Sequence, residues 1–501
     1  MCATKTGGYT TPGVYIEEKN LFPNPIVEVA TAVPAFIGYT EKAVDGNKSL
    51  LNQPKRITSM EEFRAYFGGA PQPVFTITDD PSAPSGIRSG NRNYVVKRDD
   101  RHSLYYSMLL FYANGGGACY IVSAGDYNEV LDKEKLGAGI RTLLKESEPT
   151  MVVVPEAVNL PDADGCYTLQ REMLLHCGYQ TRSRFAILDI YEGYKDRIDP
   201  DGDCIERFRE AIGDEFLDYG AAYYPWINTT IVQENELDFR NLKTGELLPI
   251  LTEEVETSAQ VDSRKAIALE YIGELDIDMN DREAETLHKT LTLLSPLYRE
   301  LMKEMHYILN LLPVSAAMAG IYTMVDNTKG VWKAPANTSI AVTVSPTVAI
   351  SHEEQEDLNL PRSGKAVNAI RAFLGEGIKI WGARTLDGNS LDWRYINVRR
   401  TMIMLEQSIK NAVKAYVFDP NVANTWVSIR SMISSFLTGV WKRGGLAGSS
   451  PEDAFSVHVG LGETMTPEDI LEGIMRVTVL VAITRPAEFI EITFQQQMQK
   501  S

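Results

Sequence analysis

The chain has 501 residues, of which 44% are hydrophobic and 23% charged, and its formal net charge is −18. This apolar content excludes a disordered chain, and 24 prolines with 37 glycines are no collagen signature. The acidic balance argues against a nucleic-acid binder with a uniformly basic surface. The length predicts a large core and roughly three domains.

The N-terminal quarter begins with extended sequence. Residues 1–25 are predicted to form an arm, because their glycines and prolines prevent a helix. Within this arm a short β-type run follows a Pro-Gly turn and comprises Val14, Tyr15, Ile16, Glu17 and Glu18. Residues 26–39 are β-rich. A short helix is predicted over 59–69, with Ser59 as N-cap, Glu62 as capping-box partner and Gly68-Gly69 at its end. Residues 70–100 are predicted to be a loop.

The middle of the chain alternates between helical and strand patterns. Helices are predicted near 103–113, 133–146, 167–178 and 204–217, and strands near 118–122, 150–154, 184–190 and 221–227. Short apolar strands separated by helices indicate an α/β layer with at least some parallel strands. Residues 331–350 return to β character.

One uncharged stretch raises the question of a membrane span. Residues 306–325 contain no Lys, Arg, Asp or Glu and have nearly the length that a span requires. Polar side chains and Pro313 interrupt this stretch. We therefore predict a helix end followed by a buried strand, and no membrane insertion.

Charge is distributed unevenly along the chain. Residues 233–285 contain fifteen acidic and five basic side chains, and with the helix predicted at 284–310 they interrupt the α/β alternation as an insertion. Residues 362–443 contain thirteen basic and five acidic side chains, a net of +8, so that the remainder carries −26. This basic segment can be a solvated face, a nucleic-acid patch or a contact surface for an acidic protein.

The C-terminal third contains two predicted amphipathic helices. Their stripes are Met402, Leu405, Ile409, Val413 and Tyr416 in the first, and Trp426, Ile429, Ile433, Phe436 and Val440 in the second. A short helix is predicted to begin after the cap Thr466. Strands are predicted at 475–484 and 488–494.

A search for catalytic motifs finds none. Gly364-Lys365 lacks the rest of a P-loop, Gly115-Gly116-Gly117 fits a helix end, and no G-x-S-x-G elbow exists. Residues 352–356 (HEEQE) are predicted to be an acidic loop. Asp276, Asp278 and Asn280 begin like a calcium loop but lack its glycine and its glutamate, which favours a solvated surface. We predict neither a metal site nor a cofactor site.

The cysteines do not indicate a disulfide framework or a zinc site. Their number is odd and no pair has CxxC spacing, so reduced thiols are expected at Cys2, Cys119, Cys166, Cys177 and Cys204. The N-terminus lacks the apolar core of a signal peptide. Both expectations are typical of a protein made in the cytosol.

Both ends of the chain are extended and β-prone. Such a strand can pair within its own subunit or add to the exposed sheet edge of another chain. If the second contact is head-to-tail and does not close, a helical filament results. The residues alone leave these alternatives open.

A series of motifs resembles one family in the order in which they occur. They are residues 11–18 (TPGVYIEE), 31–39 (TAVPAFIGY), 63–69 (FRAYFGG), 109–122 (LLFYANGGGACYIV), 331–337 (VWKAPAN), 377–400 (GIKIWGARTLDGNSLDWRYINVRR), 405–409 (LEQSI), 417–426 (VFDPNVANTW) and 485–498 (RPAEFIEITFQQQM). The chain resembles the sheath subunits of contractile injection machines, the family that includes phage tail sheaths. It is most similar to extracellular systems of the antifeeding-prophage and virulence-cassette type. The acidic segment 233–285 matches no motif of the family.

The resemblance implies a mixed α/β tail-sheath fold. Its parts would be an N-terminal arm (1–25), the first part of an inner domain with a loop (26–100), an outer α/β domain with an acidic insertion at 233–310 (101–350), a C-terminal inner domain (351–484) and a C-terminal arm (485–501). The implied function is structural, not enzymatic. Subunits would exchange β-strands, stack as hexameric rings into a helical sheath, and contract to drive an inner tube into a target.

The resemblance also implies partners and contact residues. The partners would be further copies of the chain, an inner tube protein, and baseplate and terminal cap proteins, without nucleic acid. Assembly is expected in the bacterial cytoplasm, as part of an extracellular or cell-anchored particle. Lys442 and Arg443 are the expected contacts with an acidic tube. The C-terminal arm would pair through Phe489, Ile490, Glu491, Ile492, Thr493 and Phe494. A non-contractile filament and an α/β enzyme without a recognisable motif are the alternatives.

Overall fold

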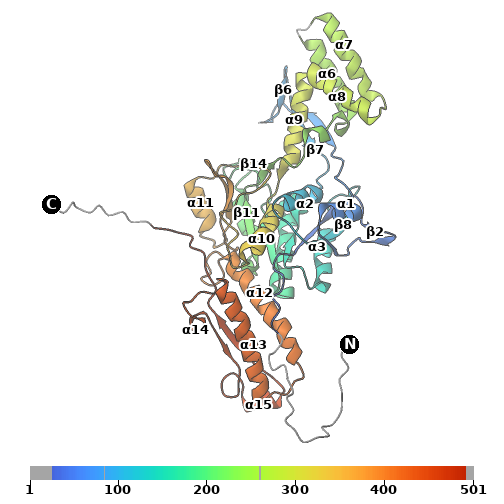
Figure 1. Ribbon diagram of the computed structural model, residues 1–501. Helices are drawn as coiled ribbons and strands as arrows, with labels where there is room; N and C mark the ends of the chain where they lie inside the picture. Colours follow the sequence, from blue (N-terminus) through green and yellow to red (C-terminus); the bar gives the residue numbers. More distant parts are fainter. Residues whose placement is uncertain (1–24, 84, 259–260, 492–501) are drawn as a thin grey trace, which may run out of the picture. The chain divides into compact units, whose positions relative to one another are not determined.

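The computed structural model describes residues 25–83, 85–258 and 261–491. The described residues form two compact units: unit 1 contains 25–28 and 407–482, and unit 2 contains 29–406 and 483–491. The mixed α/β fold expected from the sequence is confirmed (Figure 1). The finer division into inner and outer sheath domains stays a prediction.

A sheet of eight described strands is the centre of unit 2. In spatial order the strands are β16 (Gly377–Trp381), β15 (Asn368–Phe373), β11 (Gly220–Tyr224), β10 (Phe185–Asp189), β9 (Met151–Val153), β1 (Pro34–Thr40), β8 (Cys119–Asp126) and β4 (Lys55–Ile57). All neighbours are parallel except the edge pairs β15–β16 and β4–β8. The predicted parallel layer is thus confirmed.

Helices cover both faces of this sheet, which explains why its central strands are apolar at almost every position. On one face lie α2 (Leu104–Ala113) and α10 (Ser315–Lys329), which share a core with Phe36. On the other face α3 (Lys133–Thr142), α4 (Ala163–Leu175) and α5 (Cys204–Ala211) share a core with the next residue, Ile37. Successive residues of β1 therefore enter different cores.

Helix α1 (Met60–Phe67) begins as the sequence predicts, with one difference. The Ser59 hydroxyl accepts the backbone N–H of Glu62, and Gly68 ends the helix with φ of 89°. The Glu62 carboxylate, however, accepts the backbone N–H of Thr58 at 2.6 Å instead of that of Ser59. The cap therefore spans one residue more than a standard capping box. A short hairpin of β2 (Val44–Asp45) and β3 (Lys48–Ser49) precedes it.

The prediction of a loop over 70–100 is wrong. This segment forms a three-stranded antiparallel sheet in the order β5 (Phe75–Asp79), β7 (Arg92–Arg98) and β6 (Ile87–Ser89). The apolar side chains of Ile77 and Val96 are buried in it. The many turn residues in this segment made its short strands hard to recognise from sequence. The segment that packs on them is also distant in sequence: the backbone N–H of Ile77 donates to the Glu246 carboxylate at 2.8 Å.

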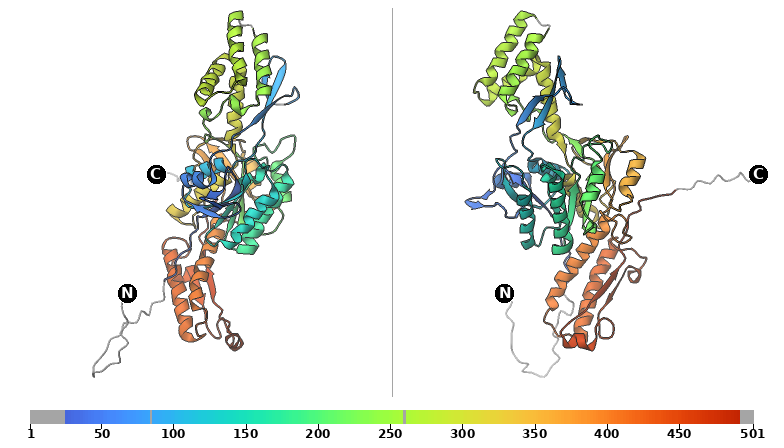
Figure 2. Two further views of the ribbon diagram at one scale, coloured as in Figure 1. Left: turned by 90° about the vertical axis from the view of Figure 1, so that its right-hand side faces the viewer. Right: turned by 180° about the vertical axis from the view of Figure 1, so that it is seen from behind.

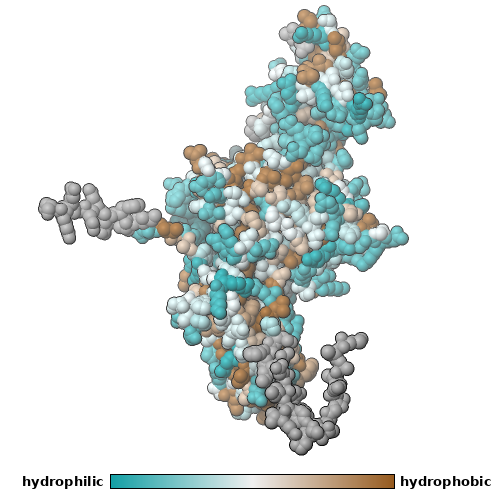
Figure 3. Space-filling view, viewed as in Figure 1, coloured by the Kyte–Doolittle hydropathy of each residue, from teal (hydrophilic) through white to brown (hydrophobic). Residues whose placement is uncertain are grey.

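The distant segment is the acidic insertion, which is helical. It comprises α6 (Thr244–Thr257), α7 (Asp262–Gly273), α8 (Asp281–Leu294) and α9 (Pro296–Asn310). The face of these helices seen in Figure 3 is mainly hydrophilic. Asn280 begins α8 by accepting the N–H of Glu283, so the calcium-like pattern around it belongs to a helix cap. Among the described residues no group of side chains could hold a metal ion.

The uncharged stretch 306–325 differs from its prediction. The buried strand expected after α9 has only two residues, β13 (Leu311–Leu312), and α10 follows at once. Small residues let α10 approach α2 closely: a Cβ on Gly320 would lie 2.5 Å from the carbonyl oxygen of Phe111. None of the described helices combines the length and apolarity needed to cross a membrane.

Two further predictions need correction. The β character expected over 331–350 is limited to β14 (Thr343–Pro346), which pairs with β12 (Ile227–Thr229) beside β13. Residues 352–356 belong to a helix, α11 (His352–Asn359), and not to a loop. Ser351 caps this helix by accepting the N–H of Glu354, a signal that the acidic composition obscured.

Unit 1 consists mainly of two long helices and a small sheet. Helix α12 (Ile396–Val413) begins in unit 2 and ends in unit 1, where α13 (Ala423–Lys442) lies beside its second half (Figures 1 and 2). β17 (Phe455–His458) and β18 (Thr478–Val481) form an antiparallel pair, flanked by α14 (Pro451–Ala454) and α15 (Pro467–Leu471). The predicted cap Thr466 is confirmed. The buried face of α13 is slightly rotated from the predicted stripe and comprises Ile429, Met432, Ile433, Leu437 and Val440.

A buried ion pair joins α10 to α12 in unit 2. The guanidinium of Arg400 donates to both carboxylate oxygens of Asp326, at 2.6 and 3.0 Å. The two side chains are 4% and 2% exposed. The same guanidinium donates to the carbonyl oxygen of Thr31 at 2.9 Å and lies 4.7 Å from the ring of Tyr322. Burying either charge alone would carry a large desolvation cost, which the opposite charge of its partner offsets.

Replacing Asp326 by alanine should destabilise unit 2 strongly, because Arg400 would remain charged and buried without its partner. We expect the free energy of unfolding to fall by about 3–5 kcal/mol. Urea titration followed by tryptophan fluorescence measures this loss. The exposed pair of Glu300 and Lys303 provides the control: Glu300→Ala should cost less than about 1 kcal/mol. Equal losses in the two variants would contradict the proposed dependence on burial.

Candidate assembly interfaces

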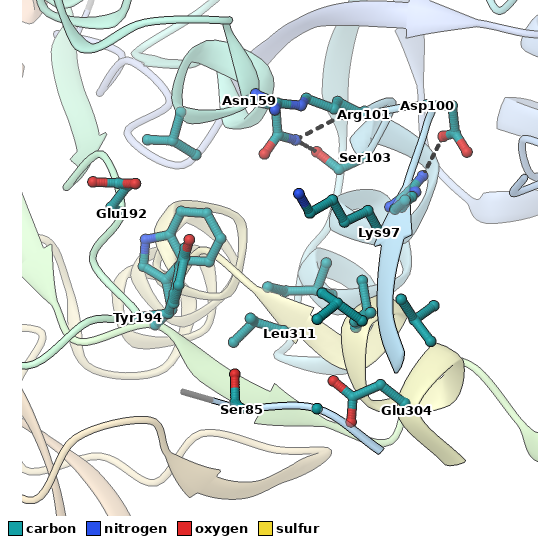
Figure 4. A pocket seen from close by; sticks show the side chains of 18 of the residues that line it. Ser85, Lys97, Asp100, Arg101, Ser103, Asn159, Glu192, Tyr194, Glu304 and Leu311 are labelled. Carbon is teal, nitrogen blue, oxygen red and sulfur yellow. Dashed lines mark hydrogen bonds and ion pairs between the residues drawn. The ribbon is translucent and has the colours of Figure 1, made fainter. Parts of the chain in front are cut away.

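A cleft of about 950 Å³ lies in unit 2 between β6, β7 and α9 and the segments that follow β9 and β10 (Figure 4). Side chains of both charges line it, among them Lys97, Glu192 and Glu304. On one wall Asn159 donates hydrogen bonds to the carbonyl oxygen of Arg101 and to the hydroxyl of Ser103, both at 2.8 Å. These hydrogen bonds hold the wall of the cleft in place. They do not bring a nucleophilic side chain next to a general base, as nucleophilic catalysis requires.

The cysteines are equally unsuited to catalysis. All four described cysteines are free and buried: Cys119, Cys166, Cys177 and Cys204. Burial raises the pKa of Cys119 and of Cys177 to about 12, so that neither thiol ionises near neutral pH. Cys2 lies outside the described residues.

The C-terminal arm leaves the fold at a polar cluster that we call the arm clamp: Asn359, Arg384, Tyr395 and Glu488. Arg384 grips the carboxylate of Glu488 with two hydrogen bonds, from Nε at 3.0 Å and from Nη2 at 2.6 Å. Asn359 and Tyr395 donate to the same carboxylate at 2.9 and 3.2 Å. Charge-assisted bidentate pairs of this kind are among the strongest hydrogen bonds in proteins.

The electrostatics of the arm clamp favour the ionised acid. Burial by itself raises the pKa of Glu488, but the hydrogen bonds from Arg384 and Asn359 outweigh it and hold this pKa below its usual value. One residue later the environment changes: Phe489 is 73% and Ile490 79% exposed. Glu488 is thus the last described residue that the fold holds.

The predicted C-terminal pairing residues follow directly after the arm clamp. Phe489, Ile490 and Glu491 are described and form no strand in this chain, so the strand predicted over 488–494 is absent from its described part. Ile492, Thr493 and Phe494 lie outside the described residues. Within the described part of the chain, the apolar side chains of Phe489 and Ile490 remain mostly exposed to solvent.

The N-terminal pairing residues Val14, Tyr15, Ile16, Glu17 and Glu18 also lie outside the described residues. The segment that connects them to β1 is held firmly. The backbone N–H of Val33 donates to the Thr150 hydroxyl at 3.0 Å, and that hydroxyl donates to the carbonyl oxygen of Thr31 at 2.7 Å. Arg400 binds the same carbonyl oxygen. The N-terminal arm therefore also has a defined exit from unit 2.

Lys442 and Arg443 occupy the C-terminal end of α13 in unit 1. Both side chains are exposed. Arg443 forms an ion pair with Glu28 at 2.5 Å, whereas for Lys442 no ion pair occurs within the described part of the chain. Arg443 thus already contacts an acid of its own unit, whereas Lys442 has no ion-pair partner among the described residues.

Sequence reasoning missed the role of the arginines in the basic segment. Arg384, Arg399 and Arg400 are almost completely buried, and each pairs with an acid that is distant in sequence: Glu488, Asp218 and Asp326 respectively. Part of the net charge of +8 therefore lies inside the fold, while basic side chains such as Lys410, Lys414 and Lys442 are exposed. The motif spanning 377–400 contained these arginines, but nothing in its pattern indicated their partners.

The small sheet of unit 1 has two outer edges. β17 and β18 pair only with each other among the described strands. Val479 and Val481 are half-buried, while Thr478 and Leu480 between them are exposed, so the predicted alternation over 475–484 is confirmed in this shorter strand. β17 packs against α13 and α14, and the two-stranded sheet offers backbone groups at its edges to which a further strand can pair.

Comparison with known proteins finds similarity to tail sheath proteins. Residues 389–497 match the phage tail sheath C-terminal domain family. The matched residues include all of α12 and α13, the small sheet and the exit of the C-terminal arm. The resemblance to tail sheath proteins expected from the sequence is thereby confirmed.

Individual relatives agree with this class. The chain is 27% identical to the sheath of an extracellular contractile injection system, the PVC sheath complex in its contracted state, with a TM-score of 0.60 and coverage of 98% of this chain and 99% of that chain. It is 25% identical to the contracted helical sheath of the anti-feeding prophage, with a TM-score of 0.61 and coverage of 98% and 100%. The tail sheath protein of Enterobacteria phage T4 is 28% identical over 27% of this chain and 20% of the phage protein. The chain spans about a fifth of the length of the curated relatives it matches first.

The arm clamp should contribute stability that depends on pH. Because the folded-state pKa of Glu488 lies below its unfolded value, the stability gained from ionisation is present above the unfolded value and is lost as pH falls through the folded-state pKa. At pH 7 we expect Glu488→Gln to lower the free energy of unfolding by about 1–3 kcal/mol. Urea titrations at pH 7 and pH 3 should show this cost shrinking in acid. Glu491→Gln is the control and should change little at either pH; a cost for Glu488→Gln that is equal at both pH values would refute the assignment.

Proposed function

We propose that this chain is the structural subunit of a contractile sheath. The observation that carries the proposal is the similarity over nearly the full length to a sheath in its contracted state, together with the sheath domain at residues 389–497. In this proposal subunits stack as hexameric rings into a helical sheath around an inner tube protein, between baseplate and terminal cap proteins. The role is mechanical and not enzymatic.

Strand exchange between subunits is the proposed mode of assembly. The small sheet of β17 and β18 would receive the N-terminal run 14–18 of one neighbour and the C-terminal run 489–494 of another as additional strands. Three features support this: the sheet has two outer edges among described strands, Leu480 in β18 is 58% exposed, and Phe489 and Ile490 are exposed beyond the arm clamp. Main-chain hydrogen bonds would then link the subunits into a continuous lattice.

Contraction would draw its energy from the contacts between subunits. An extended lattice converts to a contracted one if the second offers more favourable contacts, and the free energy difference between the two lattices drives the change. No nucleotide is required for such a step. Arms joined by β-pairing would keep neighbours connected while the subunits reorient. The particle would assemble in the bacterial cytoplasm and act as an extracellular or cell-anchored machine.

Truncation of the arms tests strand exchange. Removing residues 1–20, or ending the chain after Glu491, should abolish sheath formation, because an exchanging strand is lost while the arm clamp is retained. Negative-stain microscopy of the expressed protein measures tube formation, and circular dichroism confirms that the subunit is folded. A chain that ends after Phe494 keeps the predicted strand and should form normal tubes. Normal tubes from either strand-deleting truncation would exclude this assembly mode.

The proposed tube contact is tested by charge reversal at the end of α13. Lys442→Glu and Arg443→Glu, made separately, should each reduce the yield of extended particles on co-expression with a tube protein, because an acidic tube would be repelled. Lys442→Glu is the cleaner variant, since Arg443 also binds Glu28. Lys289→Glu, on the exposed surface of α8, changes the net charge equally and should have no effect. Extended particles in normal yield from both reversals would rule out this contact.

Microscopy of the same co-expressed particles separates a contractile sheath from a static filament. Two discrete sheath lengths, with the shorter one wider, are the expected result. A single length under all conditions would favour the non-contractile filament.

A further inference from the structure

One segment of the chain, residues 384–400, contacts the exits of both arms. At its start Arg384 and, further on, Tyr395 hold the carboxylate of Glu488. At its end Arg400 holds the carbonyl oxygen of Thr31 at 2.9 Å. The two arms come from opposite ends of the sequence, and the segments that connect them to unit 2 both contact the same seventeen-residue stretch.

A second contact reinforces the C-terminal exit. The side-chain amide of Asn397 donates to the carbonyl oxygen of Thr484 at 3.0 Å and to that of Trp332 at 2.8 Å. Asn397 is 1% exposed. The chain leading to the C-terminal arm is thus held at two points, Thr484 and Glu488, by residues of the same segment.

The segment itself is fixed internally. The guanidinium of Arg399 lies between the rings of Tyr219 and Trp393, with centroids at 4.0 and 4.1 Å, and pairs with Asp218 at 2.7 Å. The backbone N–H of Ile396 donates to the carbonyl oxygen of Ala383 at 3.0 Å. Stacked, paired and buried arginines lose little further freedom when they bind, so the segment presents its contacts at defined positions.

Burial ends abruptly at the C-terminal exit. The Glu488 side chain is 20% exposed, and two residues later Ile490 is 79% exposed. A boundary this sharp determines how many residues of the arm are available to a neighbour. It also determines the point at which a pull on the arm enters the fold.

We propose that residues 384–400 are a mechanical junction that couples the two arm exits, and that Glu488 is the positioning residue that sets where the exchanging C-terminal strand begins. This inference rests on the proposed function. Tension arriving through one arm would pass to the other through Arg384, the stacked Arg399 and Arg400. The neighbouring subunits would then be connected through one buried stretch of chain.

The test compares Glu488→Gln with Glu491→Gln in the full-length protein. Both variants neutralise one carboxylate, one inside the arm clamp and one beyond it. Hydrogen exchange of the unassembled subunit measures local opening, and negative-stain microscopy measures sheath yield. For Glu488→Gln we expect amide exchange at residues 485–488 to accelerate about ten- to hundredfold, as loss of a charge-assisted hydrogen bond implies, and sheath yield to fall at least severalfold. Glu491→Gln should leave both unchanged.

A milder variant protects the test against misfolding. Tyr395→Phe removes one hydrogen bond of the arm clamp at 3.2 Å and retains the ring, so its exchange rate and sheath yield should lie between those of the wild type and Glu488→Gln. The concentration of guanidinium that dissolves assembled sheaths should decrease in the same order. A purely local role in stability would accelerate exchange without this parallel decrease.

Other outcomes separate the two proposals. Faster exchange with normal sheath yield and normal sheath resistance would overturn the junction and leave the sheath function intact. Lower yield without faster exchange, or equal losses in both glutamate variants, would overturn it as well. Failure of the wild-type chain to form sheaths would instead refute the proposed function on which the junction rests.

Discussion

The buried ion pair of Arg400 and Asp326 is the interaction on which much of unit 2 depends. It places two charges where water is excluded, which is tolerable because the pairing is bidentate and the carbonyl oxygen of Thr31 accepts a further hydrogen bond from the guanidinium. Through these contacts α10, α12 and the chain segment before β1 meet at one point. The helix that continues into unit 1 and the strand at the centre of the large sheet therefore share an anchor.

Local sequence signals predicted the regular parts of this fold well. The apolar runs of β8, β9, β10 and β11 indicated buried parallel strands, and the caps at Ser59 and Thr466 marked helix starts that the structure contains. These features depend on residues within a few positions of each other. They are therefore visible in a single sequence without knowledge of the tertiary fold.

Secondary structure was predicted wrongly where the contacts that stabilise a segment come from residues distant in sequence. β5 and β7 are stabilised by the helical insertion some 150 residues later, and without that partner the segment 70–100 has the composition of a loop. The basic segment shows the same limitation for the candidate site. Counting its charges suggested a surface, whereas Arg384, Arg399 and Arg400 are internal and balanced by acids elsewhere. The arm clamp could not be inferred, because it joins Asn359, Arg384 and Glu488 across more than a hundred residues.

The position of β1 has a consequence for how the subunit withstands force. This strand follows directly after the exit of the N-terminal arm and lies between β8 and β9, parallel to both. A pull directed along the axis of β1 would load the hydrogen bonds of both ladders in shear, and these bonds would have to break together. A terminal strand at a sheet edge that was peeled sideways would lose its bonds one at a time. The N-terminal connection thus enters the sheet at a strand that two ladders hold, and not at an edge strand held by one.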